Sequence, residues 1–199
     1  MIKKIVFATN NLNKIKEIQA ITPSNIEWIS LAEAAIFEEL PETRETIEAN
    51  SLQKGERAFE LAGLPCMSED TGLEVEALNN EPGVRSARYA GDLSTSEENI
   101  DKLLGALHEI KNRKARFKTV ISFCTKERII QFEGILNGEI AQDRRGSNGF
   151  GYDSVFIPEG QMKTFAEMNL EEKNQMSHRK RAFVKFLSYL KLNQHDSSK

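Results

Sequence analysis

The stretch that decides the fold is Met1–Ile21, MIKKIVFATNNLNKIKEIQAI, in which an apolar segment is followed by three asparagines and then by a periodic segment. Lys3–Ala8 is rich in β-branched and aromatic residues, which predicts a short buried strand. Leu12, Ile15 and Ile18 recur at the spacing of one helix face, which predicts a helix. The chain therefore opens with a strand, a loop and a helix.

Similar patterns predict further helices and strands along the rest of the chain. Helices are predicted over Thr46–Ala62, over the stripe that follows a capping box at 94–98 and ends at Leu107, and from Ser177 over Leu190. Strands are predicted at 65–68, at 73–77, at 115–124 and 128–136 as an antiparallel hairpin, and up to Pro158. The segment 79–91 is predicted to be a loop, and the acidic segment 68–72 a turn.

Composition limits the classes of function. The chain has 199 residues, 39% hydrophobic and 29% charged, and we expect one domain over 1–192 with a flexible tail at 193–199. The net charge of −3 argues against nucleic acid as a partner, because such binding needs a basic surface. No apolar run approaches the ~20 residues of a membrane span, and no signal-peptide pattern is found, so we expect a cytoplasmic protein without a membrane partner. Cys66 and Cys124 lack a metal-binding spacing, which indicates buried free thiols.

The polar loop after the first strand is the first candidate site. Backbone N–H groups at a helix start lack intrahelical partners, and the helix dipole adds positive charge, so an anion binds well there. Asn10, Asn11 and Asn13 offer amide donors, and Lys14 lies one turn after Asn10. These groups suit a phosphate chain. The alternative is that Thr9 and Asn10 only cap the helix while Lys14 is solvated.

Acidic residues form the second candidate site. Glu69 and Asp70 follow a buried strand in "SEDTG" (68–72), and carboxylates of this kind can hold Mg²⁺ or take a proton from water. Glu42, in a loop before the second helix, is placed to supply another metal ligand. Lys54 lies on the polar side of that helix and could reach phosphate. A solvated turn for the acids and a solvated Lys54 are the alternatives.

Two further segments have ligand-binding chemistry. "GSNGFGYD" (146–153) has glycines that allow a ligand close to the backbone, Phe150 and Tyr152 to stack on a flat ring, and Asp153 to accept from base N–H groups. A plain glycine-rich hairpin is the alternative. In "EEKNQMSHR" (171–179), Lys173 precedes a helix cap, and two basic residues occupy the first helical turn. Because the dipole disfavours cations there, these residues, His178 and Arg179, suggest an anionic ligand.

Taken together, these segments resemble a known family. The ordered set "TNNLNK", "LPE", "SEDTGLEVEAL…PGVRSARYAG", "GFGYD" and "EEKNQMSHR" is similar to the inosine triphosphate pyrophosphatase family, and the resemblance covers Ile5 to about Leu190. It implies hydrolysis of noncanonical purine nucleoside triphosphates (ITP, dITP, XTP) to the monophosphate and pyrophosphate, which cleanses the nucleotide pool. It also implies a long mixed β-sheet flanked by helices, two lobes with the active site in the cleft between them, and a homodimer.

The resemblance also assigns roles to individual residues. It implies that Mg²⁺ is the cofactor, with Glu42, Glu69 and Asp70 as its carboxylates, and that Asp70 is the proton acceptor. The positions implied to contact the purine nucleoside triphosphate are Thr9, Asn10, Asn11, Asn13, Lys14, Lys54, Thr71, Phe150, Gly151, Tyr152, Asp153, Lys173, His178 and Arg179.

The chain departs from the family pattern at a few positions. Ala49–Ser51 stands where relatives often have "ENA", and Ser154 stands where a proline often follows the "FGYD" aspartate. The acidic pair is Glu-Asp rather than Asp-Asp, so either carboxylate is a candidate for the metal. Two rival functions remain open: a pyrophosphatase for other modified nucleotides, and a nucleotide-binding module without catalysis.

Overall fold

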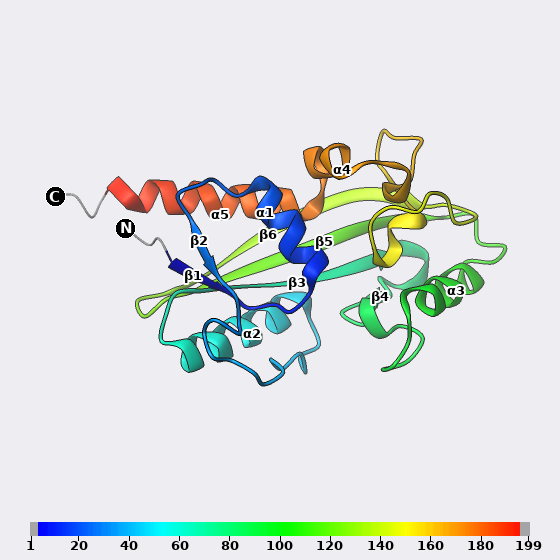
Figure 1. Cartoon of the computed structure of the whole chain (residues 1–199). Coiled ribbons are helices and arrows are strands. Elements are labelled where there is room, and N and C mark those ends of the chain that lie inside the picture. The colour runs from blue at the N-terminus through cyan, green and yellow to red at the C-terminus, as the bar shows by residue number, and fades with distance from the viewer. Residues whose placement is uncertain (1–3, 196–199) are drawn as a thin grey trace. The chain divides into compact units, whose positions relative to one another are not determined.

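The computed structural model describes the backbone of residues 4–195 and the side chains of residues 4–192. Helices and strands alternate from β1 to β3, and the later part of the chain also has consecutive strands, including the predicted hairpin (Figure 1). The strands are β1 (Lys4–Phe7), β2 (Glu27–Ile29), β3 (Cys66–Val75), β4 (Pro82–Gly83), β5 (Lys114–Cys124), β6 (Ile129–Ile140) and β7 (Phe156–Pro158). The α-helices are α1 (Leu12–Ile21), α2 (Ile47–Ala62), α3 (Ser96–Ala106), α4 (Leu170–Met176) and α5 (His178–His195).

The strands form one mixed sheet in the order β2-β1-β3-β5-β6-β7, with β4 beside β3. β1 pairs in parallel with β2 and β3, whereas β4 and β7 pair antiparallel with β3 and β6. This mixed sheet with flanking helices confirms the predicted α/β fold. Among the described residues, none of the helices combines the length and the apolar character that a membrane crossing requires.

Residue contacts divide the chain into two compact units. Within the described residues, unit 1 comprises residues 4–70, 119–134 and 179–195, and unit 2 comprises residues 71–118 and 135–178. The single domain over residues 1–192 and the cleft between two lobes stay predictions.

Unit 1 has hydrophobic clusters that pack helices against β1 and β3. In one, Ile18 of α1 and Phe183 of α5 join Ile5 and Met67; in the other, Ala58 of α2 joins further strand residues. The helix α2 also packs closely on the sheet, because a Cβ at Gly55 would lie 2.7 Å from Cys124 Sγ. Both cysteines are buried free thiols, as predicted.

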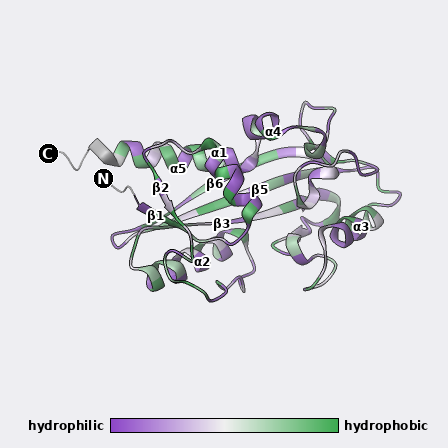
Figure 2. Ribbon diagram, viewed as in Figure 1, coloured by the Kyte–Doolittle hydropathy of each residue, from purple (hydrophilic) through white to green (hydrophobic). Residues whose placement is uncertain are grey.

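Unit 2 has its own core around β5 and α3. Leu103 of α3 packs with Phe117 of β5 and with Phe156 and Phe165. The predicted capping box is confirmed, since Thr95 and Glu98 exchange hydrogen bonds at the start of α3. Figure 2 shows both hydrophilic and hydrophobic residues along α1 and α3, as expected of helices with one buried face. A polar groove of about 810 Å³ in this unit is lined by none of the predicted site residues.

Several elements differ from the sequence prediction. The acidic segment 68–72 is no turn: β3 runs without interruption from Cys66 to Val75. The strand persists because the Glu69 carboxylate is buried against cations rather than solvated. Within the predicted loop 79–91, Pro82 and Gly83 form β4. β2 and α4 were not predicted, and residues 193–195 of the predicted tail belong to α5, while 196–199 lie outside the described residues.

Candidate active site

The loop before α1 is ordered by its own polar groups. Asn11 is the N-cap of α1, and its Oδ1 accepts hydrogen bonds from the N–H groups of Asn13 (3.0 Å) and Lys14 (3.2 Å). Thr9 Oγ1 accepts from the N–H of Asn11 at 3.1 Å. The cap is therefore Asn11, not Asn10. Residues 10–13 stay exposed to solvent, so capping leaves this helix start accessible to an anion.

Lys14 is not the solvated side chain of the alternative interpretation. Its Nζ lies 3.0 Å from Glu69 Oε1, and only 15% of the side chain is exposed. Glu69 comes from β3, so this ion pair ties the start of α1 to the neighbouring strand. The lysine nevertheless keeps part of its surface open to a ligand.

Glu69 is held by a second, buried cation. Arg179 Nε donates to Glu69 Oε2 at 2.8 Å, and Arg179 Nη2 donates to Oε1 at 3.1 Å. Burial alone would raise the pKa of Glu69, but Arg179 and Lys14 together hold it well below its usual range. The pKa of Arg179 is raised by its two carboxylate partners against the opposing effect of burial. The pair is thus fully ionised at neutral pH.

Glu17 is a member of this cluster that the sequence reasoning missed. It lies on α1, is 4% exposed, and accepts a hydrogen bond from Arg179 Nη1. Its signal in the sequence is an acidic residue on the helix face that carries the apolar Ile18 and Ile21. With Glu17 included, the cluster holds two carboxylates and two cations.

Lys54 joins the remaining carboxylates of unit 1. Its Nζ donates to Glu42 Oε1 and, at 2.7 Å, to the backbone carbonyl of Glu69, and it lies 3.8 Å from Asp70 Oδ1. Only 7% of its side chain is exposed, so the solvated alternative is wrong. The carboxylates of Glu42 and Asp70 therefore both lie next to the Lys54 ammonium.

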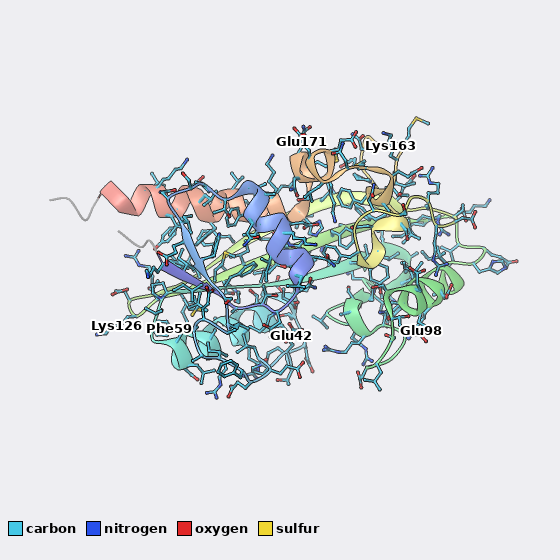
Figure 3. The ribbon with its side chains drawn as sticks, viewed as in Figure 1. Glu42, Phe59, Glu98, Lys126, Lys163 and Glu171 are labelled. Carbon is cyan, nitrogen blue, oxygen red and sulfur yellow. The ribbon has the colours of Figure 1, made fainter. Side chains whose placement is uncertain are left out.

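The loop that carries Glu42, which is labelled in Figure 3, is hydrogen-bonded to α2. Asn50 Oδ1 accepts from the N–H of Arg44 at 2.8 Å, and Gln53 Oε1 accepts from the N–H of Thr43 at 3.0 Å. Asn50 is fully buried and Gln53 lies one turn away from it. These contacts hold Glu42 beside Lys54.

Two carboxylates of unit 1 could hold a metal ion whose remaining ligands come from a bound substrate. In the part of the chain that the structure describes, no cluster of three or more His, Cys, Asp or Glu side chains is arranged to hold a metal ion. Both oxygens of Glu69 face cations, whereas Glu42 and Asp70 converge on the Lys54 ammonium. Mg²⁺ commonly binds one or two carboxylates plus substrate phosphates, and Asp70 with Glu42 suits that arrangement.

Unit 2 carries the glycine-rich segment. Asp153 Oδ2 accepts from the N–H of Phe150 at 2.8 Å and from Lys173 Nζ at 2.6 Å, with both charged side chains buried. The Lys173 ammonium also lies 4.8 Å from the centre of the Phe150 ring. Tyr152 packs in the core and donates to the Ser86 carbonyl at 2.9 Å. Of the two predicted stacking rings, Phe150 is the one that is partly exposed.

The basic helix start is placed as predicted. His178 is the first residue of α5, and its ring stacks on Phe117 with centroids 4.6 Å apart. It also lies 6.4 Å from the ring of Phe165, which Lys173 Nζ approaches to 5.3 Å. Lys173 and His178 thus share an aromatic neighbour in unit 2. Thr71, in β3, is partly exposed.

Gly149 gives a test of the Asp153 contact. A Cβ at this residue would lie 2.0 Å from Asp153 Oδ2, at a φ of +79°. Gly149→Ala should therefore displace the Asp153 carboxylate. This steric cost should lower the free energy of unfolding by about 1–3 kcal/mol beyond the cost of backbone strain at a positive φ. Gly160→Ala is the matched control, since its φ of +76° is similar and its Cβ would meet nothing within 4 Å. Equal losses for both variants in urea unfolding would contradict the steric argument.

The fold and these groups define the class of protein. It is an α/β protein whose unit 1 has a solvent-accessible helix start and a cluster of lysine and carboxylate side chains. Enzymes that catalyse phosphoryl transfer use groups of these kinds to bind phosphates and to activate water. The sequence profile of the Ham1 family matches residues 5–189. The chain therefore belongs to the Ham1 family.

Similarity to individual proteins supports this family assignment. The chain is 48% identical over 187 residues to a dITP/XTP pyrophosphatase of Flavobacterium johnsoniae, covering 94% of this chain and 97% of the relative. It is 48% identical over 189 residues, with the same coverage, to a dITP/XTP pyrophosphatase of Porphyromonas gingivalis. The Ham1 protein structure of Staphylococcus aureus matches with a TM-score of 0.89 and 39% identity, covering 96% of this chain and all of the other. The resemblance stated from the sequence is confirmed.

Proposed function

We propose that this protein is a pyrophosphatase that hydrolyses noncanonical purine nucleoside triphosphates, with dITP, XTP and ITP as substrates, to the monophosphate and pyrophosphate. The observation that carries the proposal is the 48% identity, over nearly the whole chain, with a dITP/XTP pyrophosphatase. The acidic and basic residues of unit 1 supply the groups that the reaction needs.

The triphosphate is proposed to bind at the start of α1. Thr9 to Asn13 supply amide and hydroxyl groups there, and Lys14 supplies a positive charge that is partly exposed. Lys54 adds a second ammonium next to Asp70. Phosphate contacts of this kind mainly position the substrate and neutralise charge.

Asp70 is proposed as the proton acceptor. A water molecule attacks the α-phosphorus in line, its proton passes to the Asp70 carboxylate, and the bond to the bridging oxygen breaks as pyrophosphate leaves. Asp70 and Glu42 would hold Mg²⁺, which when bound neutralises negative charge on the triphosphate. Glu69 stays on Arg179 and Lys14 in this arrangement, which distinguishes the roles of the two adjacent acids.

The purine is proposed to bind in unit 2. Phe150 stacks on the base, and the backbone N–H groups of 150–153 with His178 select a 6-oxo group. Asp153 and Lys173 hold the Phe150 segment in place through the contacts described above. Arg179 is less suited to read the base, since its Nε, Nη1 and Nη2 all donate to carboxylates.

The proposal includes the setting in which the enzyme works. We propose a cytoplasmic homodimer that has no nucleic acid partner, in keeping with the net charge of −3. Light scattering on the purified protein should give twice the monomer mass.

Product analysis tests the function. Incubation with ITP and Mg²⁺ should release pyrophosphate and IMP, and not orthophosphate. ATP and GTP should be hydrolysed with much lower kcat/KM than ITP, dITP and XTP, because an exocyclic amine meets no matching partner. Comparable efficiency on all five, or a preference for modified pyrimidine nucleotides, would favour the rival pyrophosphatase. Binding of ITP without hydrolysis would favour a non-catalytic module.

A further inference from the structure

We propose that Glu17 is a positioning residue for triphosphate binding: it fixes the Arg179 guanidinium, which fixes Glu69, which in turn places the Lys14 ammonium. The role of Lys14 in this chain of contacts rests on the function proposed above. Glu17 belongs to none of the segments that the sequence motifs single out as ligand contacts.

The first link is the fixed plane of Arg179. A guanidinium is rigid and planar, so the direction of one N–H group fixes the directions of the others. Arg179 uses Nη1 for Glu17 and uses Nε and Nη2 for the two oxygens of Glu69. At 2% exposure, the arginine has little water to replace a lost partner. Glu17 therefore holds the plane in which Glu69 accepts.

The second link is the shared oxygen of Glu69. Oε1 accepts from Arg179 Nη2 at 3.1 Å and lies 3.0 Å from Lys14 Nζ. A rotation of the carboxylate that follows Arg179 would therefore move the anchor of the lysine. Lys14 and Glu17 both lie on α1, three residues apart, so the contacts form a closed circuit from α1 through α5 and β3 back to α1.

Positioning and simple electrostatics predict opposite results. Glu17, Glu69, Lys14 and Arg179 carry no net charge together, so removal of Glu17 leaves an excess of one positive charge. If only the charge mattered, a polyanion would bind more tightly to such a variant. If Glu17 positions Lys14, the polyanion binds more weakly despite the extra charge.

The experiment compares Glu17→Ala with Glu17→Gln. Glu17→Ala should raise the KM for ITP about tenfold while kcat changes about twofold or less, because Lys14 holds the triphosphate equally in ground and transition states. Glu17→Gln keeps an oxygen that accepts from Arg179 Nη1, so its KM for ITP should stay close to the wild-type value. Gln19→Ala, at an exposed position on α1, is the control and should leave both constants unchanged. A KM that is unchanged or lowered in Glu17→Ala would overturn the proposal.

A double-variant cycle tests the route through Lys14. If Glu17 acts through Lys14, Glu17→Ala combined with Lys14→Met should bind no more weakly than Lys14→Met alone. If the two effects multiply, Glu17 acts by another route and the proposal fails. Where Glu17→Ala does not fold, the same cycle is run with Glu17→Gln, whose smaller rise in KM must also vanish on the Lys14→Met background.

The probe for binding is inorganic triphosphate, measured by calorimetry on each variant. Its affinity depends neither on the base nor on hydrolysis, so it separates this inference from the function proposed above. A wild-type protein that binds inorganic triphosphate but does not hydrolyse ITP would contradict the proposed function while Glu17 is still tested. Equal affinity of wild type and Glu17→Ala for this probe would overturn the role of Glu17.

Discussion

Replacement of Asp70 by Asn is expected to lower kcat for ITP by about 10²–10⁴-fold, the range in which a general base contributes to catalysis. An amide cannot accept the proton of the attacking water and is a weaker ligand for Mg²⁺ than a carboxylate. The fold should be retained, because Asn has nearly the same shape as Asp and its amide oxygen can still face Lys54 Nζ, which lies 3.8 Å from Asp70 Oδ1.

The measurement is the rate of pyrophosphate release at saturating ITP, with thermal unfolding recorded on the same samples. Asp92→Asn is the matched control, since Asp92 is exposed in a loop of unit 2 and should not affect turnover. Asp70→Asn with wild-type turnover would remove Asp70 from its proposed role. If Asp70→Asn loses both turnover and the folded state, Asp70→Glu tests the role instead. This variant keeps a carboxylate, so it should turn over ITP faster than Asp70→Asn if Asp70 is the general base.

Much of the fold follows from local sequence patterns. The first strand and helix, the capped helix α3 and the β5–β6 hairpin were predicted from periodicity and capping residues alone. β2 was missed because three residues are too few to show a period. α4 was missed although Asn169 and Glu172 form a capping box, because its seven residues have no clear apolar stripe.

The site was harder to predict because its partners are distant in sequence. Glu69 and Arg179 are 110 residues apart, so the sequence shows each as a charge without a partner, and solvation is then the default expectation. Lys14 and Lys54 were assigned a solvated alternative for the same reason, and both are largely buried in ion pairs. The family resemblance supplied most of the candidate residues, but Glu17 became visible only through its contact with Arg179.

Arg179→Gln should be the most destabilising of these substitutions. It leaves the carboxylates of Glu17 and Glu69 buried without their shared cation, and removing one partner of a buried ion pair costs about 3–5 kcal/mol of unfolding free energy. Lys191→Gln is the matched control on the same helix, since Lys191 is exposed and should change the free energy little. Urea unfolding at pH 7 in metal-free buffer measures both variants, and a loss below about 1 kcal/mol for Arg179→Gln would contradict the buried pairing.

The cost of Arg179→Gln should also depend on pH, with a sign that follows from Glu69. In the wild type, Arg179 and Lys14 hold the Glu69 pKa below its unfolded value against the effect of burial, so the ionised carboxylate stabilises the fold above about pH 4.3. That contribution is lost as the pH falls through the lowered pKa. In Arg179→Gln the buried carboxylate loses its main cation, its pKa rises, and protonation below neutral pH relieves the unpaired charge. The difference in unfolding free energy between wild type and variant should therefore be largest near pH 7 and shrink towards pH 4, whereas a difference that stays constant with pH would mean that Arg179 stabilises the fold by packing and not by charge.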